Sequence, residues 1–140
     1  MDAGSTLRIG AELDNLSLIR RFVEDAAIGF GADQEVIPDV LLAVTEAATN
    51  IMIHGYQGQP GTIEIEVSRK GDSLVVCLRD QAPPFDPTTV PPPDVTLPLE
   101  QRQPGGLGIH FMRQFMDELT YRSTPQGGNE LTLGKRLSAA

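Results

Sequence analysis

The sequence predicts an α+β fold, a two-layer sandwich in which a mixed, mostly antiparallel sheet carries helices on one face. Three segments repeat apolar residues at spacings of three and four, which is typical of amphipathic helices. Four segments form two pairs of strands around short turns, which is the pattern of β-hairpins. Helices placed between such hairpins favour an α+β sandwich. Because no repeat or linker divides the 140 residues, we expect one domain over 1–140.

The N-terminal half contains one strand and two helices. Residues 6–11 are the strand candidate, and residues from about 14 to 28 show helical spacing. The second helix runs from Asp33, a candidate cap, to about His54. Pro38 lies in its first turn, where proline is tolerated. Its apolar stripe is expected to contain Ile37, Leu41, Val44, Ala48 and Ile51.

The C-terminal half contains two hairpins separated by a loop and a helix. Residues 62–69 alternate apolar and polar side chains, and residues 73–80 form the partner strand after a short turn. Residues 87–104 contain six of the eleven prolines and show no regular period. Loops of this length inside a compact domain are usually functional or disordered. The chain ends with a helix from Leu107 and strands at 119–123 and 129–137.

Composition excludes several classes of partner. The net charge is −8 and the chain has only two lysines, so it lacks the basic face that nucleic acid or an anionic membrane requires. No run approaches the roughly 20 apolar residues of a membrane span, and the N-terminus lacks the pattern of a signal peptide. We therefore expect a cytoplasmic location. The single cysteine, Cys77, is expected to be a buried thiol without an internal disulfide.

Glu46 and Asn50 are the first candidate site residues. They are four residues apart on the predicted second helix, so their side chains share one face. Ala43 and Ala47 beside them are expected to leave room for a ligand. A solvated helix face explains most pairs of this kind, so the helix alone leaves both interpretations open. His54, one turn later, is either a ligand contact or a cation at the helix end.

Two further segments suggest a ligand site. Asp80 ends a predicted buried strand and enters the rigid turn "DQAPPFDP", a position from which an aspartate often contacts a ligand. The segment "GGLGI" places Gly105, Gly106 and Gly108 at a helix start, where backbone N–H groups and the helix dipole favour phosphate. A plain hinge explains these glycines about as well, and no lysine follows them as in a Walker A loop.

Three patterns occur in a fixed order along the chain. They are E-A-x-x-N-x-x-x-H-x-Y at Glu46, Ala47, Asn50, His54 and Tyr56; G-G-L-G-I…M-D-x-x-x-Y at Gly105 to Ile109, Met116, Asp117 and Tyr121; and N-x-L-x-L-x-K at Asn129, Leu131, Leu133 and Lys135. With Asp80 between them, this set resembles the ATP-binding domain of gyrase, Hsp90, histidine kinases and MutL, the Bergerat (GHKL) fold. Within it, residues from about 5 to 137 look most like the bacterial anti-sigma factor serine/threonine kinases.

The resemblance implies ATP and Mg²⁺ as ligands. Asn50 would coordinate Mg²⁺, and Glu46 would be the general base that takes the proton from a substrate serine. Asp80 would accept a hydrogen bond from the adenine amino group and so disfavour guanine. Further contacts would come from Gly105, Gly106, Leu107 and Gly108 at the phosphates, from a lid at about 87–104, and from Thr132 through water.

Three positions need separate treatment. Ala82 replaces the glycine usual in the second motif, so its methyl is expected to narrow the space near adenine. A left-handed φ there would cost about 1 kcal/mol. Phe85 belongs to the nucleotide-contacting set and is expected to pack beneath the turn rather than to stack on the base. Arg102 either reaches the phosphates from the lid or is solvated.

The resemblance implies an ATP-dependent kinase that sequesters a sigma factor and phosphorylates a STAS-type anti-sigma factor antagonist in a partner-switching pathway. Because relatives pair as homodimers, a homodimer is expected here. One alternative is a nucleotide-binding partner-switching regulator without significant kinase activity. Another is the excised catalytic domain of a histidine kinase, although only about 32 residues precede the second helix and none is histidine.

Overall fold

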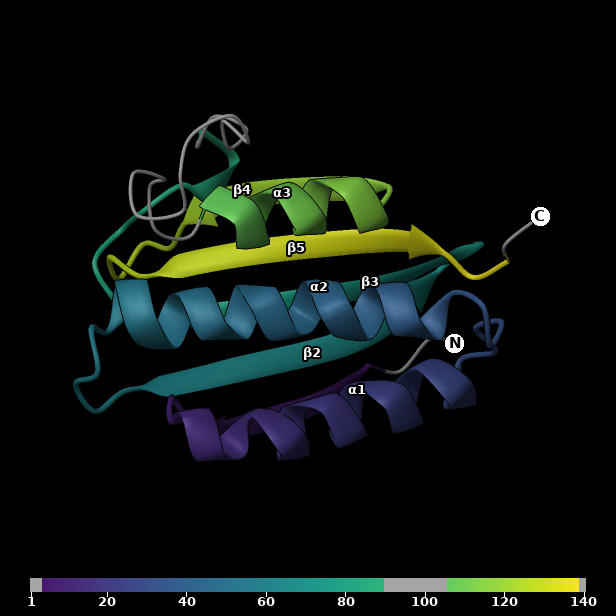
Figure 1. The fold of residues 1–140 in the computed structure, drawn as a ribbon, viewed down its shortest axis with the longest axis horizontal. Coiled ribbons are helices and arrows are strands. Elements are labelled where there is room, and N and C mark those ends of the chain that lie inside the picture. The colour runs from purple at the N-terminus through teal and green to yellow at the C-terminus, as the bar shows by residue number, and fades with distance from the viewer. Residues whose placement is uncertain (1–3, 90–105, 139–140) are drawn as a thin grey trace.

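The computed structural model describes residues 4–89 and 106–138, apart from the side chains of residues 89 and 106–108. Strands and helices follow one another in the predicted order. In Figure 1 the three α-helices lie side by side in front of the sheet. The helices are α1 Leu16–Gly29, α2 Ile37–Asn50 and α3 Gly106–Phe115. The strands are β1 Ser5–Gly10, β2 Thr62–Lys70, β3 Ser73–Asp80, β4 Glu118–Ser123 and β5 Asn129–Arg136.

The described strands form one sheet in the order β1-β2-β3-β5-β4. All four pairings are antiparallel, which confirms the predicted mostly antiparallel character. The expected mixed sheet is not found, because no parallel pair occurs among the described strands. The register places Asp80, the last residue of β3, opposite Asn129, the first residue of β5. The central strands therefore bring together two residues that are far apart in the sequence.

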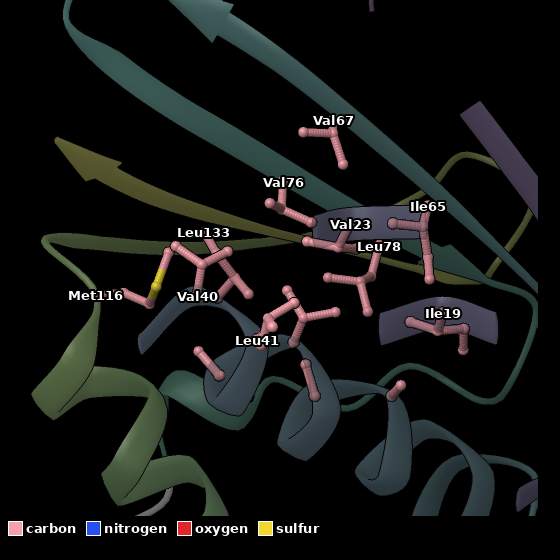
Figure 2. Packing of buried hydrophobic residues seen from close by; sticks show 14 of the residues in the cluster. Ile19, Val23, Val40, Leu41, Ile65, Val67, Val76, Leu78, Met116 and Leu133 are labelled. Carbon is pink, nitrogen blue, oxygen red and sulfur yellow. The ribbon is translucent and has the colours of Figure 1, made fainter. Parts of the chain in front are cut away.

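The core lies between the sheet and the three helices. Alternate residues of β2 and β3 point to the helices, as expected for strands with one covered face. Figure 2 shows Ile65, Val76 and Leu78 of these strands near side chains of α1 and α2. The largest fully buried side chains are Ile19, Ile63, Ile65, Leu74, Leu78, Met112 and Leu133. In the described part of the chain, no helix is both long and apolar enough to cross a membrane.

Helix α2 is buried over a wider face than its predicted stripe. Ile37, Leu41, Val44 and Ala48 are buried as predicted. Ala43 and Ala47 were expected to leave room for a ligand, but their exposed fractions are 0% and 1% because α2 lies between α1 and α3. Ala43 permits close packing in the core, whereas Ala47 also borders a small pocket next to Asn50.

Helix α2 also ends earlier than predicted. Its α-helical bonds stop at Asn50, and Ile51–Gly55 continue as a π-helical turn. In this turn the N–H of Tyr56 donates to the carbonyl oxygen of Ile51 at 2.8 Å, five residues earlier. Such turns occur frequently at functional sites. The helix predicted to run to His54 therefore changes from α-helical to π-helical bonding after Asn50. His54 is exposed in the π turn.

The other face of the sheet is polar. Arg79 in β3 pairs with Glu64 and Glu66 of β2 and with Glu130 of β5, at distances of 3.0, 3.1 and 2.9 Å. Cross-strand pairs of opposite charge stabilise neighbouring strands. Cys77 lies on this face and is buried and free, as predicted for the thiol, and its burial raises the pKa of the thiol.

Candidate functional site

A small pocket opens where β3 ends and β5 begins, with α2 and α3 as further walls. The cavity measures about 50 Å³. Ligand pockets usually measure about 300–1,000 Å³, so the enclosed part of this pocket is smaller than a typical ligand site. The pocket is lined by Ala47, Asn50, Ile51, Gly55, Asp80, Pro83, Phe85, Pro87, Met112, Tyr121, Asn129 and Leu131.

Asp80 is the buried carboxylate of this pocket, with only 4% of its surface exposed. Its Oδ1 accepts two hydrogen bonds, from the N–H of Ala82 and from Nδ2 of Asn129, both at 2.9 Å. Oδ2 has no hydrogen-bond partner among the described residues. Burial raises the pKa of Asp80, and the two hydrogen bonds to Oδ1 oppose that rise. The carboxylate therefore presents one free oxygen to a ligand.

Asn129 is the functional residue that sequence reasoning missed. Its Nδ2 donates to Asp80 and also, at 3.2 Å, to two carbonyl oxygens of the turn after β3. Its Oδ1 accepts from the N–H of Phe85 at 2.9 Å and from the hydroxyl of Tyr121 at 2.6 Å. Its place in the N-x-L-x-L-x-K pattern was the available signal, and that pattern says nothing of these contacts.

Ala82 fits the turn without strain. Among the described non-glycine residues, only Gln57 has a positive φ, of 54°. The expected cost of a left-handed alanine is therefore absent. Ala82 is 1% exposed and does not line the cavity, and a Cβ added at Gly55 would lie 3.2 Å from the Ala82 methyl. The methyl thus packs against Gly55, and the predicted narrowing of the base site is not observed.

Phe85 lies differently from its prediction. It is 52% exposed and lines the cavity, so it does not pack beneath the turn. Its backbone is held by the hydrogen bond from its N–H to Asn129. Tyr121 lines the same cavity from β4, and burial raises the pKa of its hydroxyl. An aromatic ring and a carboxylate in one pocket suit a flat heteroaromatic ligand with polar edges.

Asn50 is the last residue of α2 and lines the pocket. Its Nδ2 is buried and has no hydrogen-bond partner among the described residues. A buried donor without a partner costs about 1–3 kcal/mol, so a bound ligand or ion that engages this amide would be favoured. The amide oxygen is a ligand type that Mg²⁺ accepts, so the residues present fit a metal-bound nucleotide.

Glu46 lies one helical turn before Asn50 and is half-buried. The two side chains share a face of α2, as the sequence predicted from their spacing. Glu46 does not line the cavity around Asp80. It precedes Asn50 on α2, on the side away from the π turn.

The predicted phosphate segment is described in part. Gly106 and Gly108 form the first turn of α3, whose N–H groups have no partner within the helix. That end of a helix attracts anions. Met112, which is six residues after Gly106 on α3, lines the pocket. The start of α3 therefore lies about 9 Å along the helix axis from Met112. Arg102, Gly105 and residues 90–104 of the predicted lid lie outside the described residues, as does the side chain of Leu107.

Thr132 is not brought to the pocket. Leu131 and Leu133 point from β5 toward the helices, so Thr132 between them points to the opposite face of the sheet. Its hydroxyl lies 3.8 Å from the sulfur of Cys77 on that face. The predicted water-mediated contact with adenine is therefore wrong, and Asn129 and Leu131 are the β5 residues at the pocket.

The two histidines do not join the site. His54 is exposed, and the ring of His110 lies 6.1 Å from that of Phe111 on α3. Over residues 4–89 and 106–138, no group of three or more His, Cys, Asp or Glu side chains is placed to hold a metal ion. Metal binding here would thus depend on the ligand as well as on Asn50.

The chain is similar in sequence to proteins of known families. The family model of the histidine kinase-like ATPase domain matches residues 9–135. An anti-sigma F factor from Thermoanaerobacter sp. (strain X514) is 32% identical over 126 residues, which cover 89% of this chain and 87% of the relative. A serine-protein kinase RsbW from Bacillus cereus (strain Q1) is 29% identical over 117 residues, which cover 81% of this chain and 73% of the relative.

A solved structure shares the fold. It is the crystal structure of the RsbU and RsbW domains of Rv1364c from Mycobacterium tuberculosis, with a TM-score of 0.64 and 20% identity. The match covers 94% of this chain and 32% of that longer chain. The predicted fold class is therefore confirmed. By its sequence match, the chain belongs to the histidine kinase-like ATPase domain family, in the group that contains the anti-sigma F factors.

Proposed function

We propose that residues 1–140 form one ATP-binding domain that acts as an anti-sigma factor and a protein serine/threonine kinase. The pocket around Asp80 carries this proposal. Its buried carboxylate has one free oxygen, and its other walls include apolar and aromatic side chains. A free acceptor oxygen complements the amino group of adenine and opposes the carbonyl oxygen of guanine.

Asn50 would hold a Mg²⁺ ion together with the nucleotide phosphates. The amide oxygen would be the metal ligand, and the buried Nδ2, which has no hydrogen-bond partner among the described residues, would donate to a phosphate oxygen. A bound Mg²⁺ would neutralise charge on the phosphate oxygens during transfer. The first turn of α3, at Gly106 and Gly108, would add backbone N–H groups on the same phosphates.

Glu46 would act as the general base. It takes the proton of the substrate serine hydroxyl while the serine oxygen forms a bond to the γ-phosphorus. The bond from that phosphorus to the β–γ bridging oxygen breaks, and ADP leaves with the electron pair. The position of Glu46 one turn from Asn50 supports this role, because one helix face then carries both groups.

The partners of the chain would be a sigma factor and a STAS-type antagonist, the latter as the kinase substrate. Membership in the group of the anti-sigma F factors supports both assignments. We also propose that the chain forms a homodimer and is located in the cytoplasm. The net charge of −8 disfavours nucleic acid and anionic membranes as further partners.

The test is transfer of γ-labelled phosphate from Mg-ATP to purified STAS-type antagonists. The wild-type chain should label its antagonist, and Glu46→Gln should slow transfer by about 10²–10⁴-fold while ATP still raises the melting temperature. Glu118→Gln is the matched control, since Glu118 is an exposed glutamate at the far end of the sheet.

The outcomes separate the remaining alternatives. No shift in melting temperature at millimolar Mg-ATP would rule out the nucleotide site. A clear shift without transfer to any antagonist would support a partner-switching regulator that binds ATP but has no significant kinase activity.

A further inference from the structure

The amide of Asn129 has only one possible orientation. The N–H of Phe85 can only donate, so the atom 2.9 Å from it must be the amide oxygen. The carbonyl oxygens of Ala82 and Pro83 can only accept, so the atom 3.2 Å from each must be the amide nitrogen. The same nitrogen therefore faces Oδ1 of Asp80 at 2.9 Å as a donor.

Asp80 is held as an acceptor by two independent donors. The N–H of Ala82 and the amide of Asn129 both end on Oδ1, so this oxygen cannot carry a proton toward either of them. The carboxylate is also held in one rotation, with Oδ2 left for a ligand. Without Asn129, only the N–H of Ala82 would hold it, and a 4% exposed carboxylate could rotate or become protonated.

The same amide holds a second wall of the pocket. Its oxygen accepts from the backbone N–H of Phe85, a residue that lines the cavity, and from the hydroxyl of Tyr121 on β4. The polar and the aromatic wall are thus positioned by one side chain that is 8% exposed. Asn129 therefore sets how far the Asp80 carboxylate and the aromatic wall lie from a bound ligand.

We propose that Asn129 is a positioning residue that fixes the Asp80 carboxylate and the Phe85 backbone together, and so sets the preference for a purine with an amino group at position 6. This inference rests on the proposed nucleotide site. It concerns how strongly the base is selected, whereas the proposed function concerns what is bound and transferred.

The test compares ATP with purine riboside triphosphate, which lacks the 6-amino group, by titration calorimetry. The wild-type chain should bind ATP about tenfold more tightly, the effect of one hydrogen bond to a charged acceptor. Asn129→Leu, similar in size but without polar atoms, should reduce this ratio to below about threefold. A general structural loss would weaken both ligands alike and leave the ratio unchanged.

Thr132→Val is the matched control, because Thr132 lies on the same strand but on the other face of the sheet. It should keep the wild-type ratio. If Asn129→Leu does not fold, Asn129→Ala decides, since it removes the donor to Asp80 and brings no bulky side chain into the turn. An unchanged ratio in a folded Asn129 variant overturns the inference. Failure of the wild-type chain to bind either nucleotide instead overturns the proposed function.

Discussion

The hydroxyl of Tyr56 accepts a hydrogen bond from the backbone N–H of Gln81 at 2.8 Å, directly beside Asp80. The same hydroxyl donates to the carbonyl oxygen of Thr62 at 2.7 Å. The ring lies so close to Gly61 that a Cβ added there would come within 2.3 Å of it. Tyr56 therefore ties the turn after α2 to the start of β2 and to the end of β3.

Tyr56→Phe should destabilise the protein and weaken ATP binding. The phenyl ring keeps its place over Gly61, but the hydrogen bonds to Gln81 and Thr62 are lost. At about 1 kcal/mol for each bond, the free energy of unfolding should fall by about 2 kcal/mol. Urea denaturation measures this change, and calorimetry should show a lower ATP affinity. Unchanged values in both measurements would mean that the hydroxyl does not position the end of β3.

Asp80→Asn should invert the base preference. The N–H of Ala82 and the amide of Asn129 both donate to Oδ1, so the new amide must turn its oxygen toward them. Its NH₂ group would then face the ligand, where it opposes the amino group of adenine and suits a 6-oxo purine. Competition of ATP with inosine triphosphate measures the change. A variant that still prefers ATP would remove Asp80 from base recognition.

Ala82→Gly should destabilise the protein without improving ATP binding. The alanine has no positive φ, so glycine relieves no strain and adds freedom to the unfolded chain. It also removes a buried methyl beside Gly55, and we expect a total loss of about 1–2 kcal/mol. Thermal unfolding and ATP titration measure the two effects. A higher ATP affinity would show that the methyl obstructs the base site after all.

Arg79→Met should lower stability more at pH 7 than at pH 3. Hydrogen bonds from Arg122 and Arg79 hold the pKa of Glu130 below its usual range. A carboxyl with a lowered pKa in the folded state stabilises the protein above its unfolded pKa, and this contribution is lost as the pH falls through the folded pKa. The variant should therefore lose about 1–2 kcal/mol at pH 7, and this loss should become smaller as the pH falls through the folded pKa of Glu130.

Urea midpoints at the two pH values give this comparison. Arg8→Met is the control, because Arg8 is 73% exposed and lies 3.8 Å from Glu64 in a weaker pair. It should change stability by less than about 0.5 kcal/mol at either pH. An equal loss for Arg79→Met at pH 3 and pH 7 would show that packing, and not charge, accounts for the effect.

Local sequence patterns were enough to predict most elements. The alternation in residues 62–69 predicts β2, since one face of that strand is buried and the other is polar. The spacing in α1 predicts Ile19 and Val23 on its apolar side, and both are buried, whereas the predicted Ala26 is only half-buried and Ala27 is buried instead. The end of α2 was harder, because the change from α to π bonding at Ile51 depends on hydrogen bonds that no spacing of apolar residues reveals.

The candidate site was only partly accessible from the sequence. Asp80 is recognisable because it follows a buried strand and enters a proline-rich turn. Its partner Asn129 lies 49 residues away, and their meeting depends on the pairing of β3 with β5. The orientation of Thr132, in contrast, was accessible from the sequence. The alternation of Leu131, Thr132 and Leu133 indicates that the Thr132 hydroxyl points away from the helices.

By itself, the sequence determined the fold class, the order of the elements, and the presence of a buried aspartate at a strand end. These follow from hydrophobic periods and turn residues, which act over a few neighbouring positions. Only the tertiary structure decided which groups complete the site, that the Ala82 methyl packs on Gly55, and that one amide holds Asp80 and Phe85. Those relationships depend on strand register, and a shift of one residue would turn each side chain to the other face.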